Sequence, residues 1–166
     1  MSRFKFCPKC GGKLIDKKTY LHKRSTCNKC GFIFYQDPSP TVGVFPIKNN
    51  KVLLAKRAIE PFKGWWDSIG GFMERGESPH ETAVRETKEE TGLDVKITEI
   101  LGVGKDRYEK QYTVPIAFLG EITDGELKAA DDVEELKWFD LDHLPSNIAF
   151  EGNKKILRML KQKYRR

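Results

Sequence analysis

The sequence predicts an α/β protein in which strands dominate, preceded by a small cysteine-rich segment. Stretches rich in β-branched and aromatic residues fill the middle of the chain, and one helix with clear start and stop signals interrupts them at residues 79–91. A second, amphipathic pattern marks a closing helix near the C-terminal end, and all cysteines fall within the first 38 residues. These observations predict a small unit over residues 1–38 and a main domain over residues 39–166.

Composition limits the class of protein. The 166 residues are 39% hydrophobic and 33% charged, which is typical of a globular protein in water. No apolar run approaches the roughly 20 residues that span a bilayer, and the first residues, MSRFKFCPKC, lack the apolar core of a secretion signal. We therefore expect a cytoplasmic protein without a membrane partner.

The formal charge of +6 is unevenly distributed along the chain. The first 38 residues carry nine Lys and Arg residues against two Asp residues, and the segment from Lys154 onwards is also basic. Such clusters attract phosphate-rich ligands, including nucleic acid. A solvated surface explains them without any partner, so nucleic acid is a possible partner but not the favoured one.

The four cysteines form two Cys-x-x-Cys pairs, Cys7 with Cys10 and Cys27 with Cys30, separated by sixteen residues. This spacing favours a tetrahedral zinc site of four thiolates, which has no open position and is therefore structural. Disulfides and a redox pair are the alternatives; a cytoplasmic location disfavours the first, and no βαβ pattern supports the second. Segments 13–18 and 20–25 predict a hairpin between the pairs, too small to fold without the metal.

The main domain begins with two predicted strands, residues 41–47 and 52–57. They are joined at Asn49-Asn50, where asparagine tolerates the positive φ of a tight hairpin turn. The adjacent Trp65 and Trp66 follow this hairpin. We expect one indole to enter the core and the other to face a cleft, although burial of both rings in the core is equally consistent with the pattern.

The helix at residues 79–91 has a full set of terminal signals. Ser78 is the predicted N-cap, Pro79 suits the first helical position, Glu81 completes a Ser-x-x-Glu capping box, and Gly92 suits the position after the helix. The apolar stripe is thin and consists of small residues: His80, Ala83, Val84, Thr87 and Thr91. Core burial alone therefore does not explain this sequence.

Three carboxylates, Glu86, Glu89 and Glu90, fall within an arc of about 100° on this helix. The like-charged i,i+4 pair of Glu86 and Glu90 costs about 0.2–0.5 kcal/mol, and anions in the last turn oppose the helix dipole. One interpretation is a solvated face balanced by Arg85 and Lys88. The other is a site for a divalent cation such as Mg²⁺ or Mn²⁺, which prefers oxygen ligands.

The complete spacing decides between these interpretations. Gly71, five residues, Glu77, seven residues and then the run REXXEEXGL over residues 85–93 resembles the Nudix box, GX5EX7REUXEEXGU, in which U is a bulky aliphatic residue. Every fixed position matches, and Thr87 replaces an aliphatic residue while keeping its β-branched shape. The chain is thus similar to the Nudix hydrolase family.

The rest of the main domain fits the α/β/α sandwich around a mixed sheet that this resemblance implies. The closing helix carries its apolar residues at Ile156, Leu157, Leu160 and Tyr164. The elements predicted between the box and that helix are long strands at 95–108 and 112–122, a turn at 123–126, a strand at 135–140 and a helical turn at 141–144.

The resemblance also implies the chemistry. Nudix enzymes hydrolyse a nucleoside diphosphate linked to another group, and water attacks a phosphorus atom with the help of Mg²⁺ or Mn²⁺. Carried over by position, Glu86, Glu89 and Glu90 are metal ligands, and the Gly71 carbonyl is a further candidate. Glu86 is also the candidate for orienting or deprotonating the attacking water.

Two further groups of site residues follow from the resemblance. Arg85 and Glu77 are expected to pair and hold the loop against the helix. Many family members add a carboxylate from a distant loop; here Glu134 is the favoured candidate, followed by Glu135 and Asp132. An ordinary acidic turn is the alternative interpretation of that loop.

Candidate substrate contacts come from the segment before the box. Lys56 and Arg57 end a predicted strand and either face a phosphate or form a charged strand end. Phe62 and Trp65 are the aromatic candidates, because an exposed indole stacks on a nucleobase for about 1–3 kcal/mol. The partner is therefore a small nucleotide, and a homodimer is possible.

A zinc ribbon before a Nudix domain resembles NADH pyrophosphatases, which also remove NAD caps from RNA. Those proteins carry an SQPWPFP motif after the box, and residues 105–112 of this chain, KDRYEKQY, lack it. ADP-ribose or a related ADP-sugar is therefore the first expectation for the substrate, followed by nucleoside triphosphates. NADH hydrolysis and a catalytically silent module that binds nucleotide or RNA remain the alternatives.

Overall fold

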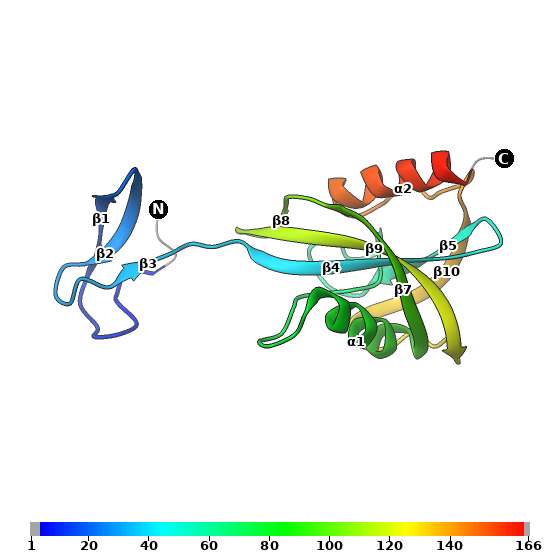
Figure 1. The fold of residues 1–166 in the computed structure, drawn as a ribbon, viewed down its shortest axis with the longest axis horizontal. Coiled ribbons are helices and arrows are strands. Elements are labelled where there is room, and N and C mark those ends of the chain that lie inside the picture. Colours follow the sequence, from blue (N-terminus) through cyan, green and yellow to red (C-terminus); the bar gives the residue numbers. More distant parts are fainter. Residues whose placement is uncertain (1–3, 165–166) are drawn as a thin grey trace. The chain divides into compact units, whose positions relative to one another are not determined.

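The computed structural model describes residues 4–164 and divides the chain into two compact units, Met1–Asp37 and Pro38–Arg166 (Figure 1). We call the first unit the ribbon and the second the main domain. None of the helices formed by the described residues is long and apolar enough to cross a lipid bilayer.

The ribbon is a small antiparallel sheet of three strands, β1 (Leu14–Thr19), β2 (His22–Cys27) and β3 (Ile33–Phe34). Strands β1 and β2 form the predicted hairpin, with Leu14 opposite Cys27 and Thr19 opposite His22. Apart from the cysteines, Leu14 is the fully buried apolar side chain of this unit, with Phe32 and Phe34 packed against the same cluster. The ribbon therefore has little core of its own.

The main domain is built on a mixed sheet, as predicted. The central pair, β4 and β9, is parallel, and the other strand pairs are antiparallel. The strand order is β10-β5-β4-β9-β7, with β6 paired to β5 and β8 paired to β9. The strands are β4 (Ser39–Lys48), β5 (Lys51–Arg57), β6 (Trp66–Asp67), β7 (Leu93–Val103), β8 (Asp106–Tyr108), β9 (Gln111–Gly125) and β10 (Val133–Asp140).

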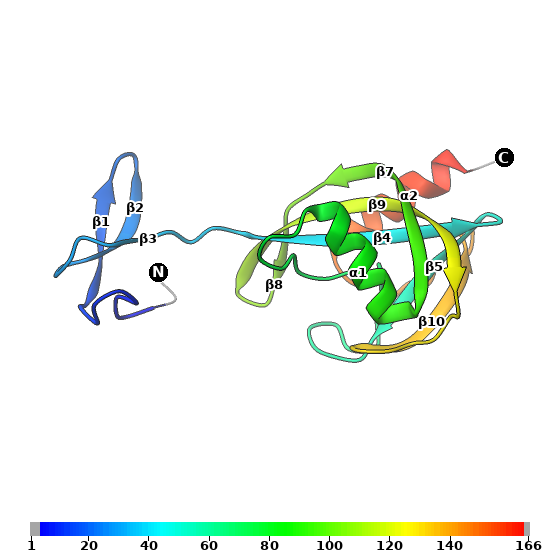
Figure 2. The same cartoon turned by 60° about the horizontal axis from the view of Figure 1, so that its bottom comes forward.

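Two helices cover opposite faces of this sheet, which gives the predicted sandwich (Figures 1 and 2). They are α1 (Pro79–Thr91) and α2 (Glu151–Lys163). Successive side chains of a strand point to opposite faces: Val44 of β4 packs in a cluster with Ala83 of α1, and Phe45 packs with Leu157 of α2. The central strand is therefore apolar on both faces, as its sequence indicates.

The turn between β4 and β5 confirms the sequence prediction. Asn49 and Asn50 have φ values of 52° and 61°, in the left-handed region that asparagine tolerates better than most residues. Lys48 and Lys51 pair directly across the turn. This two-residue connection fixes the register of the hairpin that ends at Arg57.

Three local predictions were wrong. Residues 123–125 continue β9 instead of forming a turn, because Asp124 and Gly125 pair with the first residues of β7. The strand expected at 95–108 ends at Val103, and residues 106–108 form the separate strand β8. Residues 141–144 form a turn and not a helical segment.

Candidate active site

Helix α1 is terminated as the sequence predicts. The Ser78 hydroxyl accepts a hydrogen bond from the Glu81 amide, and the Glu81 carboxylate accepts one from the Ser78 amide. Pro79 occupies the first turn, and Gly92 at φ 71° ends the helix in the left-handed region. These caps fix both the start and the rotation of the helix, and so fix which side chains face the sheet.

The buried face of α1 differs from the predicted stripe. His80 and Val84 are exposed, Val84 by 38%, whereas Glu86 and Glu90 are only 9% and 5% exposed. The sheet thus covers two carboxylates while a valine remains in solvent. Because burying a carboxylate is costly unless it is paired and hydrogen-bonded, the partners of these two carboxylates decide what this face can bind.

The glycines at the start of the box contact these two carboxylates. The Gly70 amide donates a hydrogen bond to Glu90 Oε2 at 3.1 Å. A Cβ on Gly71 would lie 2.7 Å from Glu86 Oε1, so no other residue fits there without moving the carboxylate. The Gly71 carbonyl accepts a hydrogen bond from the Val42 amide at 2.9 Å, which leaves one lone pair for any further ligand.

Arg85 binds the loop to the helix, as the sequence indicates. Its Nε and one terminal nitrogen donate to the two oxygens of Glu77 at 2.6 and 2.9 Å, and its other terminal nitrogen donates to Glu86 and Glu89. Arg85 holds the pKa of Glu77 down at about 2, assisted by the Glu74 amide and the Thr82 hydroxyl. This bidentate pair fixes the loop that carries Gly71.

The electrostatics of the buried pair favour a cation. Burial raises the pKa of Glu86, and it raises the pKa of Glu90 well above its usual value. The negative charge of Asp132 raises both pKa values further. The donors to these carboxylates are Arg85 and the Gly70 amide, so a hard divalent cation would complete the charge balance with the oxygen ligands it prefers.

The acidic segment at the start of β10 carries the three candidate distal carboxylates, Asp132, Glu134 and Glu135. Glu134, the favoured distal carboxylate, forms an ion pair with Lys56 at 2.9 Å, and Glu135 lies 3.8 Å from the same ammonium group. Asp132, ranked last from the sequence, is the residue of this segment whose charge acts on both Glu86 and Glu90. Lys56 is therefore engaged with the acidic segment.

A pocket of about 250 Å³ lies next to Gly70 and Gly71. Gly70 and Gly71, which contact the glutamates, also line this pocket. Its other walls include residues of β4, β5, β6, β7, β8 and β9 and the first residues of α2. A molecule that fills the pocket can therefore extend past the glycines towards the carboxylates.

Arg57 lies in the wall of this pocket. It donates to Asp67 at 2.8 Å and to the Pro61 carbonyl at 2.7 Å, and its guanidinium carbon lies 5.9 Å and 5.4 Å from the ring centroids of Tyr108 and Phe150. The second terminal nitrogen of Arg57 has no hydrogen-bond partner. The guanidinium group also interacts with the faces of the two rings through a cation–π contact.

Asp67 joins the strand layer to α2 at the same wall. Burial raises the pKa of its carboxyl to about 6, against the opposing effect of Arg57. The Asn153 amide group and the Ser68 amide both donate to Oδ1 of this carboxyl. The pocket thus combines apolar and aromatic residues with polar groups such as Arg57, Asp67 and Asn153, the usual composition of a small-molecule site.

The tryptophans separate as expected, but the exposed one does not line the pocket. Trp66 is buried in the core against Phe139. Trp65 is 38% exposed and packs against Phe62, whose ring contacts Phe150. Phe62 and Trp65 therefore support the aromatic wall from behind.

Several residues of the pocket were not identified from the sequence. Asp67 of β6, Tyr108 of β8, and Phe150 and Asn153 at the start of α2 come from three separate segments that no motif links. The one sequence signal for Phe150 is its position immediately before the closing helix. In the structure Phe150 is the N-cap of that helix, with a φ of 57° and no side-chain hydrogen bond that caps it. Such a backbone conformation is uncommon for a non-glycine residue.

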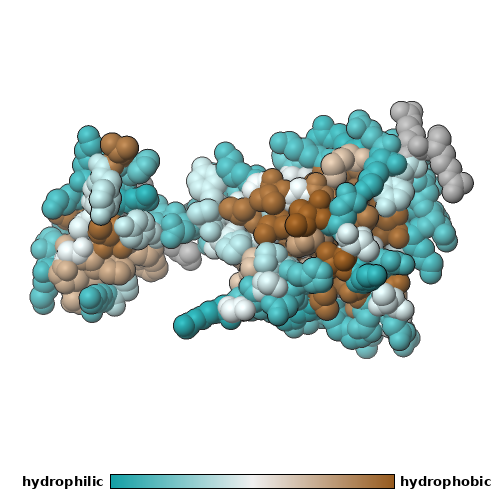
Figure 3. Space-filling view, in the orientation of Figure 1, coloured by the Kyte–Doolittle hydropathy of each residue, from teal (hydrophilic) through white to brown (hydrophobic). Residues whose placement is uncertain are grey.

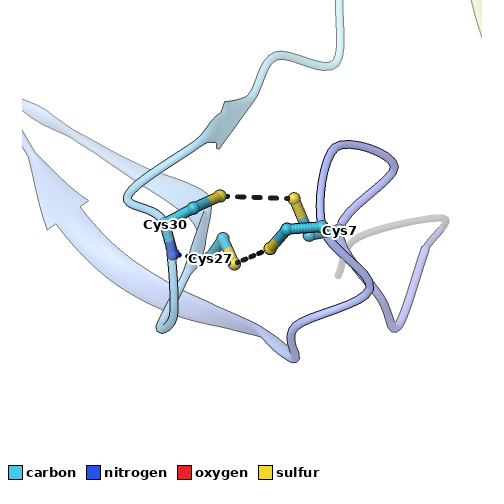
Figure 4. A group of neighbouring side chains, drawn as sticks. Cys7, Cys27 and Cys30 are labelled. Atoms are coloured by element: carbon cyan, nitrogen blue, oxygen red, sulfur yellow. Dashed lines mark hydrogen bonds between the residues drawn. The ribbon is translucent and has the colours of Figure 1, made fainter.

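Cys7, Cys27 and Cys30 of the ribbon point towards one another (Figure 4), and Cys10 belongs to the same group. Their Sγ atoms all lie within 4.8 Å of one another, with 3.8 Å between Cys7 and Cys30 and 3.5 Å between Cys10 and Cys27. A zinc–sulfur bond of about 2.3 Å gives a tetrahedron with edges of about 3.8 Å. All four thiols are free, and backbone amides of Lys9 and Lys29 donate to the sulfurs. The donor set therefore fits zinc.

A family model described as the NUDIX domain matches residues 37–160. The chain belongs to the NUDIX family. A related ADP-ribose pyrophosphatase of Methanocaldococcus jannaschii is 43% identical over 145 residues, which cover 86% of this Nudix chain and 83% of the relative. A related NAD-capped RNA hydrolase NudC of Pseudomonas aeruginosa is 32% identical over 143 residues, or 85% of this chain. Those residues are 49% of that NudC, so the chain spans about half of its length.

Solved structures agree with this membership. The crystal structure of a NUDIX hydrolase from Nitrosomonas europaea superposes with a TM-score of 0.86 at 34% identity, covering 97% of this chain and 92% of that protein. The shared fold therefore includes the ribbon as well as the main domain. As a Nudix hydrolase, the chain is an enzyme of a family that uses divalent metal ions.

Proposed function

We propose that this Nudix hydrolase cleaves the pyrophosphate of ADP-ribose or a related ADP-sugar, with Mg²⁺ or Mn²⁺ at the glutamates of the box. The observation that supports this most strongly is the pair of buried carboxylates, Glu86 and Glu90, separated from the pocket by Gly70 and Gly71. A dinucleotide-like substrate with its nucleoside half in the pocket would place its pyrophosphate beside these carboxylates.

The roles of the box residues follow from their positions. Glu86 and Glu90 supply buried oxygen ligands, and the more exposed Glu89 supplies a third from the solvent side of the helix. When bound, the divalent ion polarises the phosphoryl oxygens and lowers the pKa of a bound water. Glu86 orients that water, while Arg85 and Glu77 position the loop and do not contact substrate.

The nucleoside half of the substrate is assigned to the pocket. Tyr108 and Phe150 have nearly parallel rings 6.2 Å apart, and Arg57 lies beside both. Aromatic rings and a guanidinium group are the side chains that stack on a base. The 43% identical relative named as an ADP-ribose pyrophosphatase supports adenosine as that half and ribose phosphate as the other.

A second candidate function is hydrolysis of NADH or of an NAD cap on RNA. It is favoured by the similarity to NudC proteins over 85% of the chain. NAD and ADP-ribose share the adenosine diphosphate half, so the pocket accepts either one. A silent nucleotide-binding module is the remaining alternative, which the intact glutamates oppose.

A substrate panel tests these functions directly. The full chain is incubated with ADP-ribose, NADH, a diadenosine polyphosphate and a nucleoside triphosphate, with Mg²⁺ and with a chelator. We expect AMP release from ADP-ribose with the highest kcat/KM, and none in the chelator. Faster cleavage of NADH would favour the second function, and no cleavage of any compound would contradict an enzyme.

We also propose that Asp132, and not Glu134, completes the metal site. Asp132→Asn is expected to lower kcat for ADP-ribose about tenfold or more and to raise the Mg²⁺ concentration needed for half-maximal activity. The matched change Glu134→Gln removes only an exposed ion pair with Lys56, so kcat and the Mg²⁺ requirement should stay near the wild-type values. The opposite order of effects would restore Glu134 as the distal ligand.

For the ribbon we propose one bound Zn²⁺ with a structural role. Four thiolates fill a tetrahedral shell and leave no position for water or substrate. The small apolar core of the ribbon, described above, supports the same role, because metal binding then supplies the free energy of folding.

A further inference from the structure

The positive charge of the chain is concentrated in the ribbon. Residues 1–37 contain nine Lys and Arg residues and two Asp residues. This leaves 21 basic and 22 acidic residues, a formal charge of −1, for residues 38–166. A unit of this size with such a charge attracts polyanions over the range of the Debye length, about 8 Å at physiological salt.

The cations of the β1–β2 hairpin are placed against each other. Lys17 lies directly opposite Arg24, and Lys18 lies directly opposite Lys23. Like charges at directly opposite positions destabilise an antiparallel pair. Within the described part of the ribbon no ion pair offsets them. Because successive side chains of a strand point to opposite faces, these two pairs place two cations on each face of the hairpin. Each pair is stabilised when an external anion binds beside it.

Exposed rings lie at both ends of this cationic stretch. Tyr20 and Leu21 at the hairpin tip are each 87% exposed. Tyr35, at the other end, is 48% exposed, and the guanidinium of Arg24 lies 5.1 Å from its ring centroid. Figure 3 shows hydrophilic side chains along the hairpin and a hydrophobic one at its tip. The hairpin tip and Tyr35, which follows β3, thus place an aromatic group at each end of the cationic stretch.

We propose that the β1–β2 hairpin of the ribbon binds single-stranded nucleic acid. The phosphates contact the cationic pair of each face, Lys18 with Lys23 and Lys17 with Arg24, and bases stack on Tyr20 and on Tyr35. This arrangement of cations and rings matches a strand in which phosphates and bases alternate. An anionic bilayer would engage the tip and leave Tyr35 unused, and the ribbon of a second copy would be repelled by its equal charge.

The test uses the zinc-loaded full chain and a labelled, unstructured single-stranded RNA, with binding followed by fluorescence anisotropy at several KCl concentrations. The variant K17Q/K18Q/K23Q is expected to bind about tenfold or more weakly, and the slope of log affinity against log salt should fall by about 2, since each single-strand phosphate contact contributes about 0.7. Tyr20→Ala is expected to weaken binding about tenfold without changing that slope.

The matched control is K48Q/K51Q/K96Q, which removes three exposed lysines from the main domain. It has the same net charge as the ribbon variant and should bind RNA like the wild type. Equal weakening by both triple variants, or no RNA binding by the wild type, would overturn the proposal. So would binding to phosphatidylserine vesicles in place of RNA. Zinc content checks the fold of each ribbon variant, and ADP-ribose hydrolysis, which should not change, tests the proposed function separately.

Discussion

Replacing Glu90 with glutamine is expected to lower the Mg²⁺-dependent turnover of ADP-ribose at least about a hundredfold while leaving the fold intact. Glutamine has the shape of glutamate, and its carbonyl oxygen still accepts the hydrogen bond from the Gly70 amide. What it lacks is the negative charge that a divalent ion requires from a ligand in this position.

The thermal stability of the Glu90→Gln variant should not fall with its activity. Glu90 is 5% exposed, and burial together with the charges of Asp132 and Glu86 disfavours its ionised form. Removing the charge relieves this cost, so the melting temperature in the absence of metal should stay the same or rise. Activity and stability are therefore predicted to separate in this variant.

A suitable control is Glu121→Gln, which makes the same chemical change on an exposed position of β9. Its kcat and melting temperature should match the wild type. Near-normal turnover of Glu90→Gln at saturating Mg²⁺ would show that Glu90 is not a metal ligand.

Removing zinc is expected to unfold the ribbon and leave the main domain folded. The Cys10→Ser variant loses one of four thiolates, and structural zinc sites contribute apparent free energies of about 10 kcal/mol or more. Burial of apolar side chains in the ribbon cannot supply a comparable free energy of folding, because its buried cluster consists of Cys7, Leu14 and Cys27. Amide signals of residues 4–37 should lose their dispersion in a proton–nitrogen NMR spectrum, and those of the main domain should keep it.

The neighbouring change Lys9→Ser serves as the control for the cysteine variant. Lys9 is exposed and contacts the metal site through its backbone amide, which serine retains. This variant should bind one zinc ion per chain and keep a dispersed spectrum. Ribbon signals that stay dispersed in Cys10→Ser without bound metal would contradict a structural role for zinc.

Local signals allowed the sequence to predict the helix of the box and its partners. The caps at Ser78 and Gly92 depend on residues within a few positions of one another, and the pairing of Arg85 with Glu77 follows from fixed spacing. The same holds for the turn at Asn49 and Asn50. In each case the interacting residues are close in the chain, so their spacing determines their geometry.

Interactions between distant segments were not predictable in this way. Helical periodicity suggested Val84 for the buried stripe, but the sheet covers Glu86 and Glu90. Which residue of the acidic segment faces the box depends on a register shift between β10 and β5, and sequence spacing does not reveal such a shift. Asp67 and Phe150 line the same pocket although they are far apart in the sequence, because β6 and the start of α2 are brought together by the fold.

The most direct test of the account is a crystal structure with Mn²⁺ and a non-hydrolysable methylene analogue of ADP-ribose. The account predicts anomalous peaks bonded to the carboxylates of Glu86 and Glu90 and to non-bridging phosphonate oxygens of the analogue, with the base between Tyr108 and Phe150. An ordered analogue with its Mn²⁺ bound elsewhere, and Glu86 and Glu90 still without a cation, would contradict it.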